Sequence, residues 1–248
     1  MAADQTRSVE WRARRAIGLI DLTDLADDHS SAGIGVLCER ASAHHTAAVC
    51  VWPEYVARCH DALAGSAVRV ATVVNFPDGD DPIDDIVHRT RSALDHGADE
   101  IDVVLPYRAF LDGRPERVEG VLDAVSAIVD APRLLKVILE TGALPAERVA
   151  EAARLAIEHG ADFVKTSTGK IEVGATLPAV ETMLRVIAET DRAIGIKPSG
   201  GIRTLADSDA YLELAERVMG DGWPTPSTFR FGASGLLDAL LAELPDGS

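Results

Sequence analysis

Lysine is rare in this chain, and the few positions that carry it are the first candidates for chemistry. The sequence has 24 basic residues, and only Lys136, Lys165, Lys170 and Lys197 are lysines. Three of them, at 136, 165 and 197, stand inside short apolar runs typical of buried parallel strands. An ammonium group is costly to remove from water, so lysine seldom occupies such strands. We therefore expect these three lysines to have a function inside the fold.

Two carboxylates accompany these lysines in the sequence pattern. Asp102 lies between the apolar residues Ile101 and Val103, and Asp21 lies in the run 19–22. Because side chains alternate along a strand, the apolar neighbours would face outward and the charged residues inward. One interpretation is a purely structural ion-pair network across the interior. Three lysines against two carboxylates leave an excess of positive charge, which favours a chemical role.

Schiff-base formation is one reaction that needs such an arrangement. A neutral amine must attack a carbonyl, and a nearby cation or burial lowers the amine pKa. Two ammonium groups ~6 Å apart, at an effective dielectric of about 20, repel by roughly 3 kcal/mol, or about 2 pKa units. Desolvation must supply the rest of the shift toward neutrality at pH 7.

Glycine clusters follow three successive predicted strands. They are the segments 166–170, 199–203 and 232–235. Glycine permits close backbone approach, and Lys170, Arg203 and Ser234 would add charge or hydrogen bonds. Each cluster alone is more often a turn, but barrel enzymes bind phosphate in the loops after their last strands. We expect a phosphate site here that is not a P-loop, because Val164 and Ile171 replace the required Gly and Ser/Thr.

The elements that must position these residues alternate between strands and helices. Eight strands are predicted, at 19–22, 46–52, 68–76, 101–105, 134–139, 163–166, 193–197 and 228–231. Eight helices are predicted, near 32–43, 54–64, 83–96, 115–129, 147–159, 178–190, 205–219 and 233–243. This count predicts a single-domain (β/α)8 TIM barrel over 1–248, with a helical N-terminal extension at 1–17 and a short tail at 244–248. A doubly wound open sheet is the alternative.

Composition narrows the class of protein. The net charge of −16 argues against binding to nucleic acid or anionic membranes, since phosphate backbones need a basic surface. We find no apolar run long enough to span a membrane, no secretory signal and no metal-ligand spacing. Three cysteines indicate a reduced, cytoplasmic protein rather than a disulfide framework. Cys50 fits either a small core residue or a thiol lining a pocket.

Long motifs in fixed order resemble deoxyribose-phosphate aldolase, a class I aldolase family of the (β/α)8 type. The resemblance runs from Ile20 to Leu241. Its motifs are DLT at 21–23, TAAVC at 46–50, ATVVNFP at 71–77, GADEIDVV at 97–104, LKVI at 135–138, VKTSTGK at 164–170, KPSGGIR at 197–203 and FRFGAS at 229–234.

The resemblance implies a Schiff base at Lys165, with Asp102 and Lys197 as proton donors and acceptors. It implies phosphate binding by Gly169, Lys170, Gly200, Gly201, Arg203, Gly232 and Ser234, with Asp21, Thr23, Cys50, Lys136 and Thr168 in supporting places. The implied reaction is reversible cleavage of 2-deoxy-D-ribose 5-phosphate to acetaldehyde and D-glyceraldehyde 3-phosphate. The resemblance further implies phosphosugar and aldehyde substrates and no metal or other cofactor. A homodimer is possible.

This chain departs from the family pattern at a few positions. Gly235 stands where a second serine is common, His45 stands where asparagine is common, and the sequence lacks a tyrosine-ending tail. Two alternative functions stay open at this point. One is another phosphosugar Schiff-base aldolase or transaldolase-like enzyme, which would not release acetaldehyde. The other is a non-catalytic phosphosugar-binding barrel, in which Lys165 or Asp102 would normally be lost.

Overall fold

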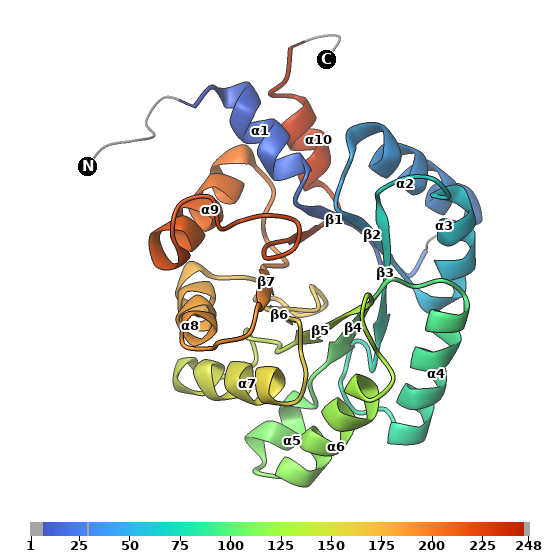
Figure 1. Ribbon diagram of the computed structural model, residues 1–248, viewed down its shortest axis with the longest axis vertical. Helices are drawn as coiled ribbons and strands as arrows, with labels where there is room; N and C mark the ends of the chain where they lie inside the picture. Colours follow the sequence, from blue (N-terminus) through green and yellow to red (C-terminus); the bar gives the residue numbers. More distant parts are fainter. Residues whose placement is uncertain (1–6, 29, 246–248) are drawn as a thin grey trace.

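Eight parallel strands form a ring in the computed structural model, which describes residues 7–28 and 30–245 (Figure 1). The strands are β1 Ile20–Asp24, β2 Ala48–Val51, β3 Arg69–Val74, β4 Glu100–Val104, β5 Leu134–Ile138, β6 Phe163–Lys165, β7 Gly195–Lys197 and β8 Phe231–Ala233. Neighbouring strands pair in the order β7-β6-β5-β4-β3-β2-β1-β8. The helices surround this ring, as expected of a (β/α)8 barrel.

The ring closes between β7 and β8 through isolated contacts rather than a full ladder. Parallel bridges join Ile196 to Phe229 and Ser199 to Gly232, and the Gly232 amide donates to the Pro198 carbonyl at 2.9 Å. Closure excludes the open-sheet alternative and confirms the barrel. The last strand begins at Phe231, three residues later than predicted, because its continuous pairing is with β1, where Ile20 pairs with Phe231.

Helices follow the strands along the chain, with a few differences from expectation. They are α1 Val9–Ile17, α2 Ser31–His44, α3 Val56–Ala62, α4 Ile83–Asp95, α5 Tyr107–Leu111, α6 Pro115–Ser126, α7 Ala146–Glu158, α8 Leu177–Ala188, α9 Leu205–Met219 and α10 Leu236–Leu241, with a 3₁₀ turn η1 at Pro53–Tyr55. The short helix α5 was not predicted, and α10 starts three residues late because 231–233 is strand.

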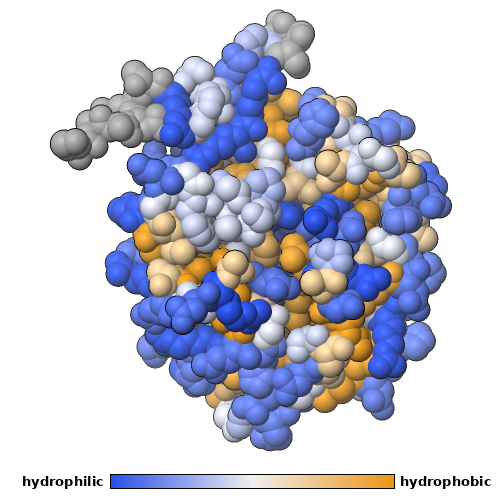
Figure 2. All heavy atoms as spheres, viewed as in Figure 1, coloured by the Kyte–Doolittle hydropathy of each residue, from blue (hydrophilic) through white to orange (hydrophobic). Residues whose placement is uncertain are grey.

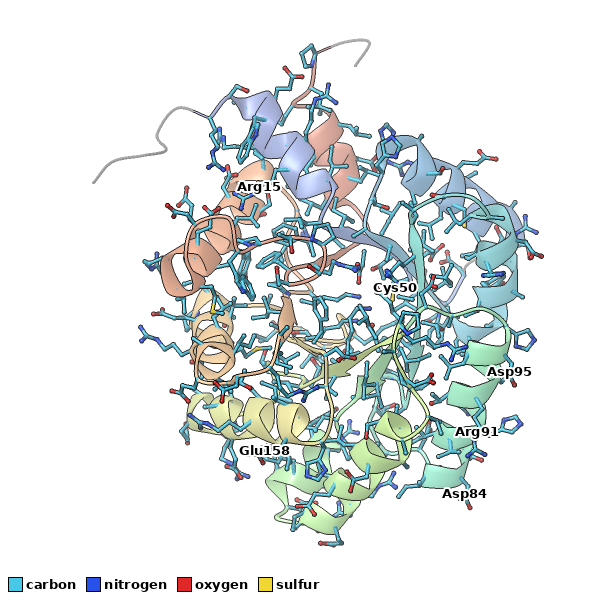
Figure 3. The ribbon with its side chains drawn as sticks, viewed as in Figure 1. Arg15, Cys50, Asp84, Arg91, Asp95 and Glu158 are labelled. Carbon is cyan, nitrogen blue, oxygen red and sulfur yellow. The ribbon has the colours of Figure 1, made fainter. Side chains whose placement is uncertain are left out.

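Side-chain alternation separates an apolar layer from a charged interior. Val137, Val164 and Ile196 are fully buried in the same apolar cluster as helix residues such as Leu184. On the outer surface, polar residues predominate on the helices, with apolar patches between them (Figure 2). Figure 3 shows Asp84 and Asp95 pointing outward from α4, whereas Cys50 lies on β2 inside the ring. Charged side chains inside the barrel therefore depart from the usual separation of an apolar interior from a polar surface.

A repeated Gly-Ala-Asp sequence leads into β4 and β6 and fixes their register. Gly97 and Gly160 take φ values of 96° and 98° just after α4 and α7, a conformation that glycine adopts without strain. Two residues on, Asp99 accepts the Val70 amide at 2.8 Å and Asp162 accepts the Leu135 amide at 2.9 Å. Each aspartate thus fastens its segment to the preceding strand.

The N-terminal extension forms the helix α1, which lies beside α9 and α10 (Figure 1). Arg12 pairs with Asp209, and Arg15 pairs with Glu216 at 2.5 Å, so both basic residues bind α9. Residues 1–6 of the predicted extension and 246–248 of the predicted tail lie outside the described residues. In the described part of the chain, no helix has the length and apolarity to cross a membrane.

Candidate active site

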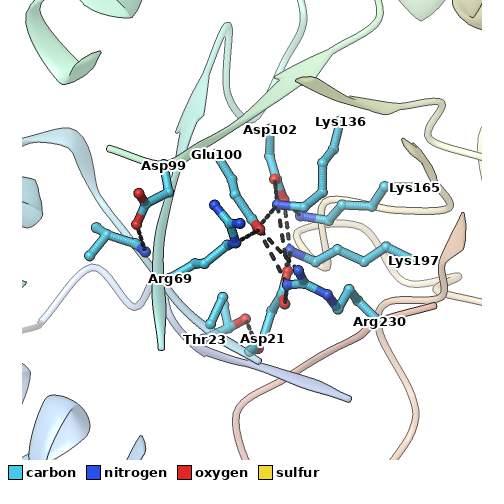
Figure 4. Close-up of polar contacts among 12 residues, drawn as sticks. Asp21, Thr23, Arg69, Asp99, Glu100, Asp102, Lys136, Lys165, Lys197 and Arg230 are labelled. Atoms are coloured by element: carbon cyan, nitrogen blue, oxygen red, sulfur yellow. Dashed lines mark hydrogen bonds and ion pairs between the residues drawn. The ribbon is translucent and has the colours of Figure 1, made fainter. Parts of the chain in front are cut away.

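Asp102 is the centre of the buried charge cluster, as Figure 4 shows. Its Oδ2 accepts from Lys165 Nζ at 2.9 Å and from Lys197 Nζ at 2.8 Å, while Oδ1 accepts from Lys136 Nζ at 2.8 Å. The strands β4, β5, β6 and β7 bring these four residues together, with Lys165 directly opposite Lys197 in the ladder. The three strand lysines predicted to point inward do so.

Three further charged residues, Asp21, Glu100 and Arg230, complete the cluster. Arg230 donates to Asp21 Oδ1 at 2.6 Å and to Glu100 Oε1 at 3.0 Å. Glu100 also pairs with Lys136 at 2.5 Å, and Asp21 Oδ2 pairs with Lys197 at 2.6 Å. The interior ion-pair network considered as the structural alternative therefore exists. Its composition is four cations and three carboxylates, so one positive charge remains in excess.

The pKa values of the two lysines that share Asp102 Oδ2 move in opposite directions. Burial lowers the pKa of Lys165 and exceeds the opposing effect of Asp102, and the positive charge of Lys197 lowers it further. For Lys197, burial is outweighed by Asp102 and Asp21, so its pKa rises well above the usual value. Lys197 thus remains a cation while Lys165 shifts toward the neutral amine that a nucleophile requires.

Asp102 and Lys136 keep their ordinary charges. The pKa of Asp102 lies well below its usual value because Lys136, Lys165 and Lys197 together outweigh the cost of its burial. The pKa of Lys136 is raised, since Asp102 and Glu100 outweigh desolvation. A carboxylate with three ammonium neighbours can accept a proton only when one of those partners moves or changes its charge.

A cavity of about 610 Å³ opens at the carboxyl ends of the strands and reaches the cluster at one residue. Lys165 lines this cavity, whereas Asp102, Lys136, Lys197 and Arg230 do not. Its other lining residues come from the ends of β1 and β8 and from the loops after β1, β6, β7 and β8. A small molecule in the cavity would meet the Lys165 amine with Asp102 and Lys197 immediately behind it.

The predicted glycine clusters line the same cavity. Gly200 and Gly201 have φ values of 84° and 85°, which place their backbone in a region that glycine favours. At Gly232, an added Cβ would lie 2.1 Å from Ser199 Oγ and 3.1 Å from Lys197 Cε, so only glycine lets β8 approach this closely. Gly169, Ser234 and Gly235 also line the cavity.

The basic residues predicted to bind phosphate stand at the cavity mouth. Lys170 Nζ pairs with Asp27 at 3.1 Å and lies 5.8 Å from the centre of the Trp52 ring. The backbone amide of Arg203 donates to Asp207, and Arg203 lines the cavity. Thr23 lines it as well, with its hydroxyl donating to the Asp21 carbonyl at 2.8 Å.

Three other predicted positions lie apart from the open cavity or support its wall. Cys50 is fully buried beside the charge cluster, does not line the cavity, and its pKa is raised by burial. Thr168 lines the cavity, and its hydroxyl donates to Glu140 at 2.5 Å while accepting the Lys170 amide at 3.1 Å. His45 is exposed before β2, at the amino ends of the strands, so this departure from the family pattern does not touch the cavity.

Sequence reasoning missed Glu100, Arg230 and Glu140. Glu100 stands two residues before Asp102 and so shares its side of β4, a signal that the alternation argument could have used. Arg230 lies between two phenylalanines just before β8, so the same alternation argument could have placed it inward. Glu140 follows β5 with φ at 57°, and burial raises its pKa. Nothing in the local sequence predicts that left-handed conformation.

A closed (β/α)8 barrel with lysines buried beneath a loop-lined cavity defines the class of this protein. The chain belongs to the DeoC/LacD family of aldolases, whose pattern matches residues 15–239. A deoxyribose-phosphate aldolase from Agrobacterium fabrum is 47% identical over 239 residues, which cover 95% of this chain and 92% of that protein.

Solved structures share this architecture. A crystal structure of a candidate deoxyribose-phosphate aldolase from Coccidioides immitis is 30% identical, with a TM-score of 0.83 over 97% of this chain and 88% of that chain. The tetrameric deoxyribose phosphate aldolase from Aeropyrum pernix is 22% identical, with a TM-score of 0.78 over 96% of this chain and 98% of that chain. The latter likeness concerns the fold alone.

Proposed function

We propose that this chain catalyses the reversible cleavage of 2-deoxy-D-ribose 5-phosphate to acetaldehyde and D-glyceraldehyde 3-phosphate, with Lys165 as the Schiff-base nucleophile. One observation carries the choice of lysine. Lys165 alone among the cations of the charge cluster lines the cavity, and its pKa is lowered while those of Lys136 and Lys197 are raised. Membership of the aldolase family and the 47% identical relative support the choice of substrate.

The reaction follows from the position of Asp102 between the two lysines. The neutral Lys165 amine adds to the open-chain aldehyde of the sugar, and loss of water gives an iminium ion. This cation accepts the electron pair of the C2–C3 bond when the C3 hydroxyl loses its proton. Asp102, with Lys197 as its charged partner, moves protons during addition, dehydration and cleavage. The resulting enamine is protonated at carbon and hydrolysed, which releases acetaldehyde and regenerates Lys165.

The glycine loops bind the other end of the substrate. Gly200, Gly201, Ser234 and Lys170 line the cavity. Backbone amides there would donate to a dianionic phosphate, and Lys170 would add a positive charge at the mouth. Binding there fixes the distance between the phosphate and the aldehyde carbon, so the reacting end reaches Lys165. Arg203, Gly169 and Gly232 shape the same wall, and Thr23 and Thr168 border it.

Reductive trapping tests the assignment. Borohydride added in the presence of acetaldehyde should attach a two-carbon group to the peptide that contains Lys165. Lys170, an accessible lysine at the cavity mouth, serves as the internal control for unselective alkylation. An adduct on Lys136 or Lys197, or equal labelling of Lys165 and Lys170, would contradict the assignment. Release of acetaldehyde from 2-deoxy-D-ribose 5-phosphate separates this activity from that of another Schiff-base aldolase or a transaldolase-like enzyme.

The proposal extends to the setting in which the enzyme works. All three cysteines are free and buried, which agrees with a reducing cytoplasm. We assign phosphosugar and aldehyde substrates, no nucleic-acid or membrane partner, and no metal or organic cofactor. A homodimer is the proposed assembly, and light scattering on the purified chain would test it. Activity that is lost with a chelator and restored by zinc would contradict the metal-free reaction.

A further inference from the structure

The floor of the charge cluster consists of Glu100 and Arg230, two residues that the proposed reaction does not use. Both are buried, with exposed fractions of 0% and 2%. Arg230 Nη2 lies 3.0 Å from Glu100 Oε1, and its Nη1 lies 2.6 Å from Asp21 Oδ1. Its guanidinium also lies 5.7 Å from the centre of the Phe163 ring, which faces inward below Lys165. The pair therefore connects β4 to the segment just before β8.

Each member of this pair shares a partner with a residue close to Lys165: Glu100 shares Lys136 with Asp102, and Arg230 shares Asp21 with Lys197. Glu100 binds Lys136 at 2.5 Å, so the positive charge of Lys136 is shared between Glu100 and Asp102. Arg230 binds one oxygen of Asp21, and Lys197 binds the other at 2.6 Å. Removing either member changes how much charge Asp102 and Lys197 retain toward Lys165. The pair acts on Lys165 through these two intermediaries and not by contact.

The balance of charges in this network affects whether Lys165 is protonated. The linked network among the described residues has the cations Lys136, Lys165, Lys197 and Arg230 and the carboxylates Asp21, Glu100 and Asp102. When Lys165 is neutral, three positive charges face three negative charges. Without Arg230 the balance would favour a protonated Lys165, and without Glu100 it would favour the neutral amine even more strongly.

We propose that Glu100 and Arg230 are positioning residues that set the charge state of Lys165, Glu100 through Lys136 and Asp102, and Arg230 through Asp21 and Lys197. The proposal rests on the proposed function, in which Lys165 is the nucleophile. It assigns a purpose to a buried pair that is otherwise costly to keep, since buried ion pairs often stabilise a fold no more than apolar residues of similar size. Neither residue touches the substrate cavity, so neither is a catalytic residue.

Other groups near Lys165 must stay constant for a clean test. Those that face it or act on it are Asp102 on β4, Lys197 on β7, Cys50 on β2 and Glu140 after β5. Arg69 on β3 lies 3.9 Å from Glu100 at the floor, with its side chain 43% exposed to solvent. Cys50 has a raised pKa and stays uncharged near neutral pH, and Glu140 binds Thr168, a contact that none of the substitutions below removes.

The experiment compares variants whose predicted effects have opposite signs. The acid limb of kcat/KM against pH follows deprotonation of the free-enzyme amine, and so does the pH dependence of borohydride trapping on Lys165. Glu100→Gln removes a negative charge and keeps the shape, so both midpoints should move to lower pH by roughly half to one unit. Arg230→Met removes a positive charge, so both midpoints should move to higher pH by a similar amount.

Two further variants separate charge from packing. Arg230→Lys retains the charge, so its midpoints should stay close to those of wild type even where its activity falls. The double variant Glu100→Gln/Arg230→Met restores the charge balance, so its midpoints should return toward wild type. Circular dichroism on each variant establishes that the barrel is folded. If Arg230→Met does not fold, the nearly isosteric Glu100→Gln variant decides the question by itself.

Unmoved midpoints in Glu100→Gln, or a shift to higher pH, would overturn the role of the pair. The same holds if both single variants shift in one direction. Failure of the proposed function has a different signature, because wild-type protein would then form no adduct on Lys165 at any pH. An adduct on wild-type Lys165 with pH-insensitive variants would leave the aldolase function intact and reduce Glu100 and Arg230 to structural residues.

Discussion

The charge cluster and the glycine loops border one cavity but are constructed by opposite means. The cluster consists of charged side chains on or next to strands, held by ion pairs of 2.5–3.6 Å and nearly closed to solvent. The loops present backbone at Gly200, Gly201 and Gly232, and their one lysine, Lys170, stands at the mouth. In the proposed reaction, the chemistry would depend on buried charge and the recognition of phosphate on backbone shape. Substitutions in the two regions should therefore change different kinetic constants.

The largest effect is expected from loss of the nucleophile. Lys165→Leu removes the only amine of the cluster that reaches the cavity, so the rate of cleavage should fall by roughly 10⁴-fold or more. The substitution also leaves Asp102 with one cation fewer. Lys136 and Lys197 still bind Asp102, so the barrel should fold. Steady-state kinetics and borohydride trapping measure the loss. Substantial remaining activity, with an adduct on another lysine, would move the nucleophile elsewhere.

A second substitution tests whether Lys197 lowers the pKa of Lys165. In Lys197→Leu the neighbouring cation is gone while Asp102 and Asp21 remain, so the Lys165 pKa should rise. A raised pKa leaves less neutral amine at neutral pH, and activity lost there should return as the pH increases. We expect a fall of about 100-fold or more at pH 7 and a pH optimum displaced upward. A variant with the wild-type rate and pH profile would show that Lys197 is structural.

The sequence predicts the charge cluster more completely than the glycine loops, and the reason is physical. Lysine in an apolar strand is so costly that its type and alternation alone indicate an inward charge, and the structure brings Lys136, Lys165 and Lys197 together on Asp102. Arg230 was missed although it lies between Phe229 and Phe231 in the predicted strand 228–231, the same apolar flanking that indicated Asp102. In the structure this segment contacts β7 only through isolated bridges. The count of interior charges was therefore incomplete, although the excess of one cation is the same.

The loops were predicted less completely, because their shape depends on partners distant in sequence. The glycine clusters indicated a phosphate site, but the buried contact of Glu140 with Thr168, which holds one loop in place, joins residues 28 positions apart. Likewise, Gly232 is required by the approach of Ser199 and Lys197 from another strand. Such tertiary contacts leave no local pattern in the sequence. The ligand roles of these loop residues stay predictions.

Substitution of Lys170 tests whether recognition can be changed without changing the chemistry. Lys170→Ala removes one charge-assisted contact to phosphate and should raise KM for the phosphorylated substrate about 10- to 100-fold, with kcat nearly unchanged. Unphosphorylated deoxyribose should be affected much less. Asp27→Asn is the matched control, because it frees Lys170 from its ion pair and should not raise KM. Equal losses with both substrates would assign Lys170 to the chemistry or the fold.

The smallest expected effect comes from adding a hydroxyl where the family commonly has one. An added Cβ at Gly235 would meet no atom within 4 Å, and its φ of −101° suits any residue, so Gly235→Ser should be accommodated without strain. A hydroxyl at this cavity-lining position could donate to phosphate, and a neutral hydrogen bond contributes on the order of 1 kcal/mol, so KM should fall about two- to tenfold. Gly235→Ala supplies the carbon without the hydroxyl and should leave KM unchanged. Because Gly235 also precedes α10, serine could stabilise the helix start by a few tenths of a kcal/mol. Thermal unfolding without ligand measures that contribution separately. A KM that falls equally in both variants would mean that backbone stiffening and not the hydroxyl improves binding, and the phosphate would then be held at this corner by amides alone.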